Sequence, residues 1–392
     1  MLLNLKFVVG LVATAALASA SEDAGISVEL FRRSDSPRYS QLDVERTYKH
    51  LEGINLKYLK AFANFLKNTG KEHPLKLKSH NKRWTASIDL VDIKSELEWG
   101  GELRFGTPEQ SVYFDFDTGS ADTIANPDAY VPSKSNTAED THSKFSAGYG
   151  DGTNAHGHVY TDVFRAGSIH AKKVAIGHSK STFIPNSEHP NQGIAGLSHP
   201  SIQAFDSKYK PFFTELRDQK AVHQGVFQFT LKAGNGSTLE LGRIDESKFN
   251  GKLTWVNYNP ALGFYLMTAK VNGNKILAII DSGTTLIIGP TGQVRSLLQK
   301  LPNVSMFTKD NTLYGRFPCN QPPKVTFNFG GKDFTLGKDQ VSYGKSGNDC
   351  VLSVVGQDNL PLHAWVVGDS FFQMASIVFD QDNNRVGFAP QA

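Results

Sequence analysis

Two short stretches that repeat one pattern constrain this chain more than any other feature. Residues 114–120 read Phe-Asp-Phe-Asp-Thr-Gly-Ser, and residues 279–285 read Ile-Ile-Asp-Ser-Gly-Thr-Thr. In each stretch, an apolar run typical of a β-strand leads into a turn that holds an Asp, a hydroxyl residue and a Gly. Asp117 and Asp281 lie 164 residues apart, about the length of one domain. We therefore expect two lobes, with one Asp turn in each.

The repeated turns predict a pair of reacting carboxyls, Asp117 and Asp281. A buried carboxylate is costly unless it is hydrogen-bonded, and Gly119 and Gly283 would let the backbone come close enough to donate N–H groups. Two such turns face to face would hold the carboxyls about 3 Å apart, where they share one proton. One carboxylate can then activate a water while the protonated one polarises a carbonyl. A single Asp-Thr-Gly is a common turn, but two copies at this spacing are hard to obtain by chance.

Several further motifs in the body of the chain carry a family resemblance. Residues 99–110 predict a strand, a Gly-Thr-Pro turn and a returning strand, and residues 147–157 have the glycine-rich composition of a β-hairpin. Residues 192–197 (Gln-Gly-Ile-Ala-Gly-Leu) and 365–372 each place two apolar residues before a Gly. With the two Asp turns, these motifs resemble the pepsin-like aspartic proteases, in the style of the penicillopepsin-type fungal enzymes, from about Trp99 to Ala392.

The resemblance implies a fold and a set of site residues. The fold would be all-β and bilobal, a double barrel with a central cleft and a six-stranded interdomain sheet. Thr118 and Ser282 would brace the two turns, while Ser120 and Thr284 would bond to the outer carboxylate oxygens. Tyr149 would be the tyrosine of a flap hairpin over the cleft. The expected substrate-binding residues are Tyr149, Gly150, Asp151, Thr153, Gly119, Gly283, Thr284 and Thr285.

Asp151 raises a question of specificity. It follows Tyr149 by two residues, so both side chains point to one face of a hairpin. The resemblance places Asp151 in the primary specificity pocket, which favours large apolar substrate side chains and, through the carboxylate, Lys. The alternative is that Asp151 only caps the turn between two glycines.

This chain departs from the family pattern in three places. Ile124 stands where relatives have a Trp that bonds to the flap tyrosine. No Cys precedes Cys319, so a small disulfide loop is missing, and Gln192 replaces a usual Asp. How the flap is anchored is therefore left open by the sequence.

The first 83 residues differ from the body. Residues 1–20 have one Lys, an apolar run and Ala-Ser-Ala, as in a secretory signal peptide; a buried N-terminal helix is the disfavoured alternative. Residues 21–83 hold thirteen Lys or Arg and eight Asp or Glu and end in Lys82-Arg83. We predict a propeptide there, with a helix whose apolar residues include Leu51, Leu59 and Leu66 and which ends at Gly70. A solvated basic helix of the mature protein is the alternative.

The remaining expectations complete the domain plan. Residues 84–257 would form the N-terminal lobe and residues 258–392 the C-terminal lobe. In the resembling family a propeptide Lys lies near the two carboxyls, and Lys76 and Lys78 are the candidates. Cys319 and Cys350 predict a disulfide in a secreted chain, with two buried thiols as the alternative. Asn235 and Asn303 begin glycosylation sequons.

Composition and missing motifs narrow the function classes. The sequence has no His or Cys cluster with metal spacing and no nucleotide-binding loop, so we expect no metal and no cofactor. The slight negative charge of the body argues against nucleic acid, and we expect a monomer without a membrane anchor. Extracellular delivery is predicted, with the vacuole as the alternative.

These observations predict a secreted aspartic endopeptidase made as a zymogen, inhibited by its own propeptide and acting on polypeptides at acid pH. An inactive pepsin-like peptide-binding protein is one rival. A glycosidase is the other, but its carboxyls normally lie about 5–10 Å apart and outside twin Gly turns.

Overall fold

The computed structural model describes residues 25–32, 44–77, 99–148, 154–184, 191–233, 236–358 and 360–392. Predictions that fall on other residues lie outside the described part: the signal peptide, the dibasic site Lys82-Arg83, a strand expected at 88–93, the hairpin residues Tyr149, Gly150, Asp151 and Thr153, and the sequon residue Asn235.

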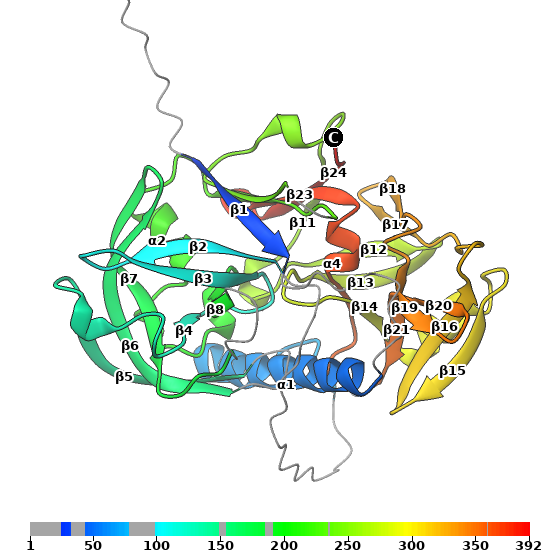
Figure 1. Ribbon diagram of the computed structural model, residues 1–392, viewed down its shortest axis with the longest axis horizontal. Helices are drawn as coiled ribbons and strands as arrows, with labels where there is room; N and C mark the ends of the chain where they lie inside the picture. Colours follow the sequence, from blue (N-terminus) through cyan, green and yellow to red (C-terminus); the bar gives the residue numbers. More distant parts are fainter. Residues whose placement is uncertain are drawn as a thin grey trace, which may run out of the picture.

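The fold is all-β and bilobal, as the resemblance implied, with few helices (Figure 1). Within the described residues, thirteen strands join in one sheet in the order β11-β24-β23-β9-β10-β1-β2-β3-β8-β4-β7-β6-β5. Their bounds are β1 Ile26–Arg32, β2 Trp99–Phe105, β3 Gln110–Asp117, β4 Thr123–Ala125, β5 Glu139–Gly148, β6 Asn154–Ala166, β7 Ile169–Ser179, β8 Asn191–Gly196, β9 Val226–Thr230, β10 Ser237–Leu241, β11 Thr254–Asn257, β23 Ala375–Asp380 and β24 Arg385–Pro390.

Eleven further strands of the described chain form the second lobe's sheet. They are β12 Leu266–Val271, β13 Asn274–Ile280, β14 Ile287–Gly289, β15 Ser305–Lys309, β16 Thr312–Pro318, β17 Thr326–Phe329, β18 Lys332–Thr335, β19 Ser342–Ser346, β20 Asp349–Leu352, β21 Val354–Gln357 and β22 Trp365–Val367. The α-helices are α1 Val44–Thr69, α2 Phe212–Asp218, α3 Thr291–Leu298 and α4 Asp369–Phe372.

Six strands of the larger sheet, β11, β24, β23, β9, β10 and β1, link the lobes. The sixth strand is β1 from the N-terminal segment, which pairs with β10 from Ile26↔Leu241 to Leu30↔Ser237 and then with β2. The strand at Ile26–Arg32 was not expected from the sequence.

Helix α1 lies across both lobes along one side of the molecule (Figure 1). It ends as predicted, because Gly70 adopts a positive φ of 71° and its N–H bonds to the carbonyl of Leu66 at 2.9 Å. Of the apolar residues at the predicted helical spacing, Leu51 is buried, whereas Leu59 and Leu66 are 46% and 43% exposed. The buried apolar residues of the helix are Leu51, Ile54, Tyr58, Ala61, Phe62 and Phe65.

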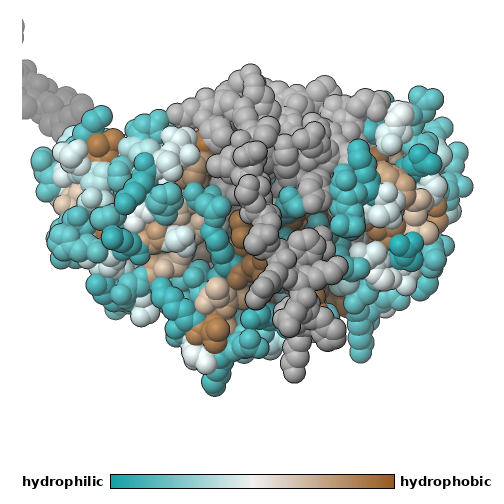
Figure 2. Space-filling model, turned by 90° about the horizontal axis from the view of Figure 1, so that it is seen from below, coloured by the Kyte–Doolittle hydropathy of each residue, from teal (hydrophilic) through white to brown (hydrophobic). Residues whose placement is uncertain are grey.

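The buried apolar residues of α1 belong to one cluster with apolar residues of the second lobe. Phe264, Ile279, Leu286, Tyr314 and Val355 belong to this cluster. Seen from the α1 side, the described surface is mainly hydrophilic, with hydrophobic residues at several separate places (Figure 2). The helix therefore covers an apolar strip between the lobes, where the two Asp turns also lie.

Candidate active site

The two Asp turns are built by the same arrangement of three strands. In the first lobe β3 runs parallel to β8, with Asp117 opposite Gly196, and β4 runs antiparallel to β8. In the second lobe β13 runs parallel to β22, with Ile280 opposite Val367, and β14 runs antiparallel to β22. The two apolar-apolar-Gly motifs thus supply the strands beside each Asp.

Hydroxyl groups tie the two turns to each other. The Thr118 hydroxyl donates to the Ile280 carbonyl at 2.9 Å and accepts from the Ser282 N–H at 2.9 Å. In the mirrored arrangement, the Ser282 hydroxyl donates to the Phe116 carbonyl at 2.7 Å and accepts from the Thr118 N–H at 3.1 Å. Because all these groups are buried, the four bonds fix the distance between the lobes at the carboxyls.

Each carboxyl accepts a hydrogen bond from its own turn. The Gly119 N–H bonds to Asp117 Oδ1 at 2.8 Å, and the Gly283 N–H bonds to Asp281 Oδ1 at 3.1 Å. A Cβ at Gly119 would lie 2.5 Å from Asp281 Oδ1, and one at Gly283 would meet the Asp117 carboxyl. Each glycine is therefore required because the carboxyl of the opposite lobe packs against it.

The outer hydroxyls differ between the two lobes. The Thr284 hydroxyl donates to Asp281 Oδ2 at 2.9 Å. Ser120 lies near enough to Asp117 to favour its charged form, but the buried hydroxyl has no partner at hydrogen-bonding geometry among the described residues. Thr285 is fully buried and its carbonyl accepts the Ser370 hydroxyl at 2.9 Å, so this residue lies inside the turn's support.

A lysine of helix α1 binds both carboxyls. Lys57 Nζ lies 2.7 Å from Asp117 Oδ1 and 3.0 Å and 3.1 Å from the two oxygens of Asp281. The next residue, Tyr58, donates its hydroxyl to Asp281 Oδ2 at 2.9 Å. One buried ammonium group therefore bridges the two Asp side chains.

Lys57 corrects the expectation that Lys76 or Lys78 takes this role. Lys76 instead forms an exposed ion pair with Glu72 at 3.1 Å, and Lys78 lies outside the described residues. A usable signal was present in the sequence: Lys57 falls three residues after Ile54 and four before Ala61, on the apolar face of the helix. A Lys on an apolar helix face needs a buried partner.

Burial and ion pairing act against each other at this cluster. Burial raises the pKa of Asp117, and Lys57 only partly opposes this. Burial would also raise the pKa of Asp281, but Lys57, Tyr58 and Thr284 together lower it below its usual range. Burial would lower the pKa of Lys57, yet attraction to both carboxyls raises it above its ordinary value, so the lysine stays charged.

The C-terminal half of α1 is held by the loop around the 3-10 helix η2 (Pro200–Ile202). The Asn64 amide donates to the Ile202 carbonyl at 3.1 Å, and the Asn68 amide donates to the Gln203 carbonyl at 2.9 Å. Lys67 Nζ donates to the Ala204 carbonyl at 3.2 Å. These polar contacts add a fixed register to the apolar packing of the helix.

The base of the predicted flap hairpin is described, and its tip is not. Strands β5 and β6 pair up to Gly148↔Asn154, and Lys60 of α1 donates to the Asn154 side chain. Ile124, which stands in place of the usual Trp, is fully buried in one cluster with Phe145 of β5. The role of Tyr149 therefore stays a prediction from the sequence.

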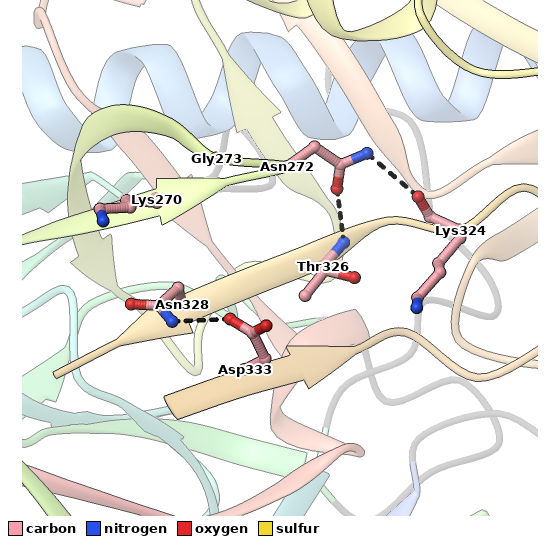
Figure 3. Close-up of a pocket in the computed structure, with 7 residues that line it drawn as sticks. All are labelled: Lys270, Asn272, Gly273, Lys324, Thr326, Asn328 and Asp333. Carbon is pink, nitrogen blue, oxygen red and sulfur yellow. Dashed lines mark hydrogen bonds between the residues drawn. The ribbon is translucent and has the colours of Figure 1, made fainter. Parts of the chain in front are cut away.

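Two further features lie away from the carboxyls. Cys319 and Cys350 form the expected disulfide, 31 residues apart in the chain. The sequon residue Asn303 is exposed and has a positive φ of 60°. A separate surface pocket in the second lobe is lined by residues of β12, β17 and β18 and by nearby loops (Figure 3). Its polar groups bond to one another, as when Asn272 accepts the Thr326 N–H at 2.7 Å.

Across the residues that the structure describes, no three His, Cys, Asp or Glu side chains gather closely enough to hold a metal ion. In the same part of the chain, no helix combines the length and apolarity needed to cross a bilayer.

The fold and the twin Asp turns agree with a family comparison. The family model described as eukaryotic aspartyl protease matches residues 98–391, and the chain belongs to this family. It is similar over its full length, at 47% identity, to the whole of "Secreted aspartyl protease 1" of Malassezia globosa. It is 35% identical to "Aspartic protease" of Phaffia rhodozyma, over 79% of this chain and 80% of the relative.

A third relative shows that family membership alone does not decide activity. The chain is 29% identical to "Probable inactive secreted aspartyl protease" of Malassezia globosa, over 78% of this chain and 82% of the relative.

Proposed function

We propose that this protein is a secreted aspartic endopeptidase made as an inactive precursor. The observation that carries the proposal is the pair of buried carboxyls, Asp117 and Asp281, bridged by one ammonium group of the N-terminal segment. A buried cation on two carboxylates neutralises a site that is otherwise too negative to stay fully ionised. The same two carboxyls, with the lysine removed, share one proton and can act as an acid–base pair.

In the proposed reaction, the carboxylate of the pair removes a proton from a water molecule as that water attacks the peptide carbonyl. The protonated carboxyl donates a hydrogen bond to the carbonyl oxygen. The pair titrates together, so the shared proton belongs to neither Asp alone. The hydrogen bonds between Thr118 and Ser282 hold the two carboxyls in register for this step.

Residues 21–83 act in this proposal as the inhibitory propeptide. Lys57 and Tyr58 occupy the hydrogen-bonding positions of the carboxyls that the water and the substrate carbonyl need. Helix α1 lies over the apolar strip that would receive substrate side chains. Cleavage near Lys82-Arg83, by a processing protease or by the enzyme itself, would give a mature protein starting near Trp84.

Residues 1–20 would direct secretion, in agreement with the names of the Malassezia globosa relatives. Residues 84–257 and 258–392 would be the two catalytic lobes of a monomer, with N-linked glycans at Asn235 and Asn303. Substrates would be polypeptides with large apolar residues before the cleaved bond, and Asp151 would add acceptance of Lys.

Acidification of the purified full-length protein tests this proposal. We expect self-limited cleavage near residue 83, then hydrolysis of unfolded protein with a bell-shaped pH profile centred below pH 7. Asp117→Asn and Asp281→Asn should stay folded and be nearly inactive. A folded protein that binds peptides but leaves them intact at every pH would favour the inactive peptide-binding alternative.

A further inference from the structure

His73 lies between helix α1 and the second lobe, in the short segment that follows the helix. Its side chain is buried, with the residue only 2% exposed. The ring stacks on Phe62 at 4.7 Å between centroids and meets the edges of Phe65 at 4.7 Å and Phe264 at 5.5 Å. Two of these rings belong to α1 and one to the body, so the histidine sits inside the interface between them.

Both ring nitrogens of His73 have partners that fix the neutral form. Nε2 lies 2.8 Å from the Leu262 carbonyl, which can only accept, so Nε2 carries the proton. Nδ1 accepts the Leu75 N–H at 3.2 Å, so Nδ1 has none. A second proton on the ring would remove the bond to Leu75 and would place a positive charge in a buried site without a described anion. Burial accordingly lowers the pKa of His73 below its usual range.

The segment held by His73 also joins the body along its backbone. The Leu77 N–H bonds to the Pro361 carbonyl at 3.0 Å, and the His363 N–H bonds to the Leu75 carbonyl at 3.2 Å. The side chain of Leu75 is buried in the same apolar cluster as Leu362. Protonation of His73 would therefore weaken docking of the segment through Leu75, because Leu75 bonds both to His73 and to the body.

None of the described charged groups near His73 would offset a positive charge on its ring. On its own segment, Glu72 and Lys76 pair with each other at the surface. On the facing segments, His363 is exposed, and the 3-10 helix η4 (Pro260–Leu262) carries no charged residue. Lys67 near the end of α1 bonds to a carbonyl of the η2 loop.

The other buried acids do not release the helix under mild acid. The pKa of Asp281 is lowered, so its contribution to docking is present above the ordinary carboxyl pKa and is lost only as pH falls further. The pKa of Asp117 is raised, and burial raises the pKa of Asp122 to about 6. These shifts belong to the docked form. Release removes Lys57, and the carboxyls of Asp117 and Asp281 then share one proton, so this pair also favours opening as pH falls, but near the ordinary carboxyl pKa and therefore below the range in which His73 acts.

We propose that His73 is the proton sensor that releases helix α1 from the cleft under mildly acidic conditions. This inference rests on the proposed role of the segment as a propeptide. The docked segment holds the neutral imidazole, whereas a released His73 takes up a proton below a pH of about 6.5. Falling pH therefore shifts the equilibrium from docked to released α1. The equilibrium constant for opening rises by up to about ten-fold per pH unit, until the docked histidine itself becomes protonated.

The test uses the full-length protein with four sequences: wild type, His73→Gln, His73→Phe and His363→Gln. The Gln variant can still donate to Leu262 and accept from Leu75 but cannot be protonated in this range. The Phe variant keeps the ring packing alone. His363→Gln removes an exposed histidine of the same interface and serves as the matched control.

Opening is measured by seconds-long hydrogen–deuterium exchange of residues 51–65 between pH 4 and 7.5, corrected for intrinsic exchange at each pH. Wild type and His363→Gln should open roughly five-fold more between pH 6.5 and pH 5.5 and approach ten-fold per pH unit below that, whereas both His73 variants should be nearly flat between pH 6.5 and pH 5.5. Equal pH dependence in all four proteins would overturn the sensor.

Peptide hydrolysis by the same samples separates this result from the proposed function. If α1 opens with the predicted pH dependence but no sample ever hydrolyses peptide, the endopeptidase proposal fails and the sensor stands. If the samples become active proteases with no dependence on His73, the sensor fails and the endopeptidase proposal stands.

Discussion

Replacing Lys57 by Met should convert the precursor into a partly active enzyme without any cleavage of the chain. Met keeps the length and apolar stem of the side chain but removes the ammonium group that lies 2.7 Å from Asp117 and 3.0 Å from Asp281. Breaking a buried ion pair by removing one partner typically costs about 3–5 kcal/mol. The two carboxyls recover part of this by sharing a proton, so we take the lower end, about 3 kcal/mol. The fraction of open, substrate-accessible molecules should rise roughly a hundred-fold.

Lys60→Met is the matched control, because Lys60 lies one helical turn away and contacts the flap hairpin at Asn154 instead of the carboxyls. Both variants should carry Lys82→Gln and Arg83→Gln, which remove the predicted dibasic site. The assay is initial hydrolysis of a fluorogenic peptide at pH 5.5, with mass spectrometry to verify an intact chain. Equal activity in Lys57→Met and Lys60→Met would refute the argument that the ammonium group maintains the inhibited state.

Three further predictions concern stability and specificity. Loss of the Cys319–Cys350 disulfide, by Cys→Ser at both positions, should lower the free energy of unfolding by roughly 2–4 kcal/mol in urea titration; an unchanged midpoint would contradict this. Burial lowers the pKa of His199 to about 4, so wild type should lose roughly 3 kcal/mol of stability between pH 6.5 and pH 4 that His199→Phe does not lose, and parallel pH–stability curves would count against the assignment. Asp151→Ser should reduce kcat/KM for Lys peptides roughly 10- to 100-fold but spare Phe peptides; an equal loss on both would make Asp151 a turn residue.

The Asp turns could be predicted from the sequence because their chemistry is local. An apolar strand, an Asp and a Gly follow one another closely in the sequence, and the second copy of this motif, around Asp281, can be found in the same way. The hydrogen bonds of Thr118 and Ser282 could be expected only from the family resemblance, since no local pattern tells which turn faces which. The Ser120 hydroxyl, which the same resemblance expected to bond to the outer oxygen of Asp117, has no partner at hydrogen-bonding geometry among the described residues.

Helix α1 was predictable as a helix, but the face that it buries was not. Its end at Gly70 is a local signal, whereas the buried face depends on the surface that receives it. Leu59 and Leu66 fit the helical period and yet face outward, while Lys57 lies inward because the two carboxyls are there. Strand β1 was missed for a similar reason: its partner β10 lies more than 200 residues away.

Strand β1 would make the refolding of the mature protein, under the maturation proposed above, a different problem from the folding of the full-length chain. It is the piece of chain that closes the interlobe sheet between β10 and β2. The proposed cut after residue 83 would separate this strand from the polypeptide, so a mature chain that unfolds would lack one of the six strands that join its lobes. The edges of β10 and β2 that pair with β1 would then be open. We therefore expect the lifetime of the mature protein to be governed by its rate of unfolding.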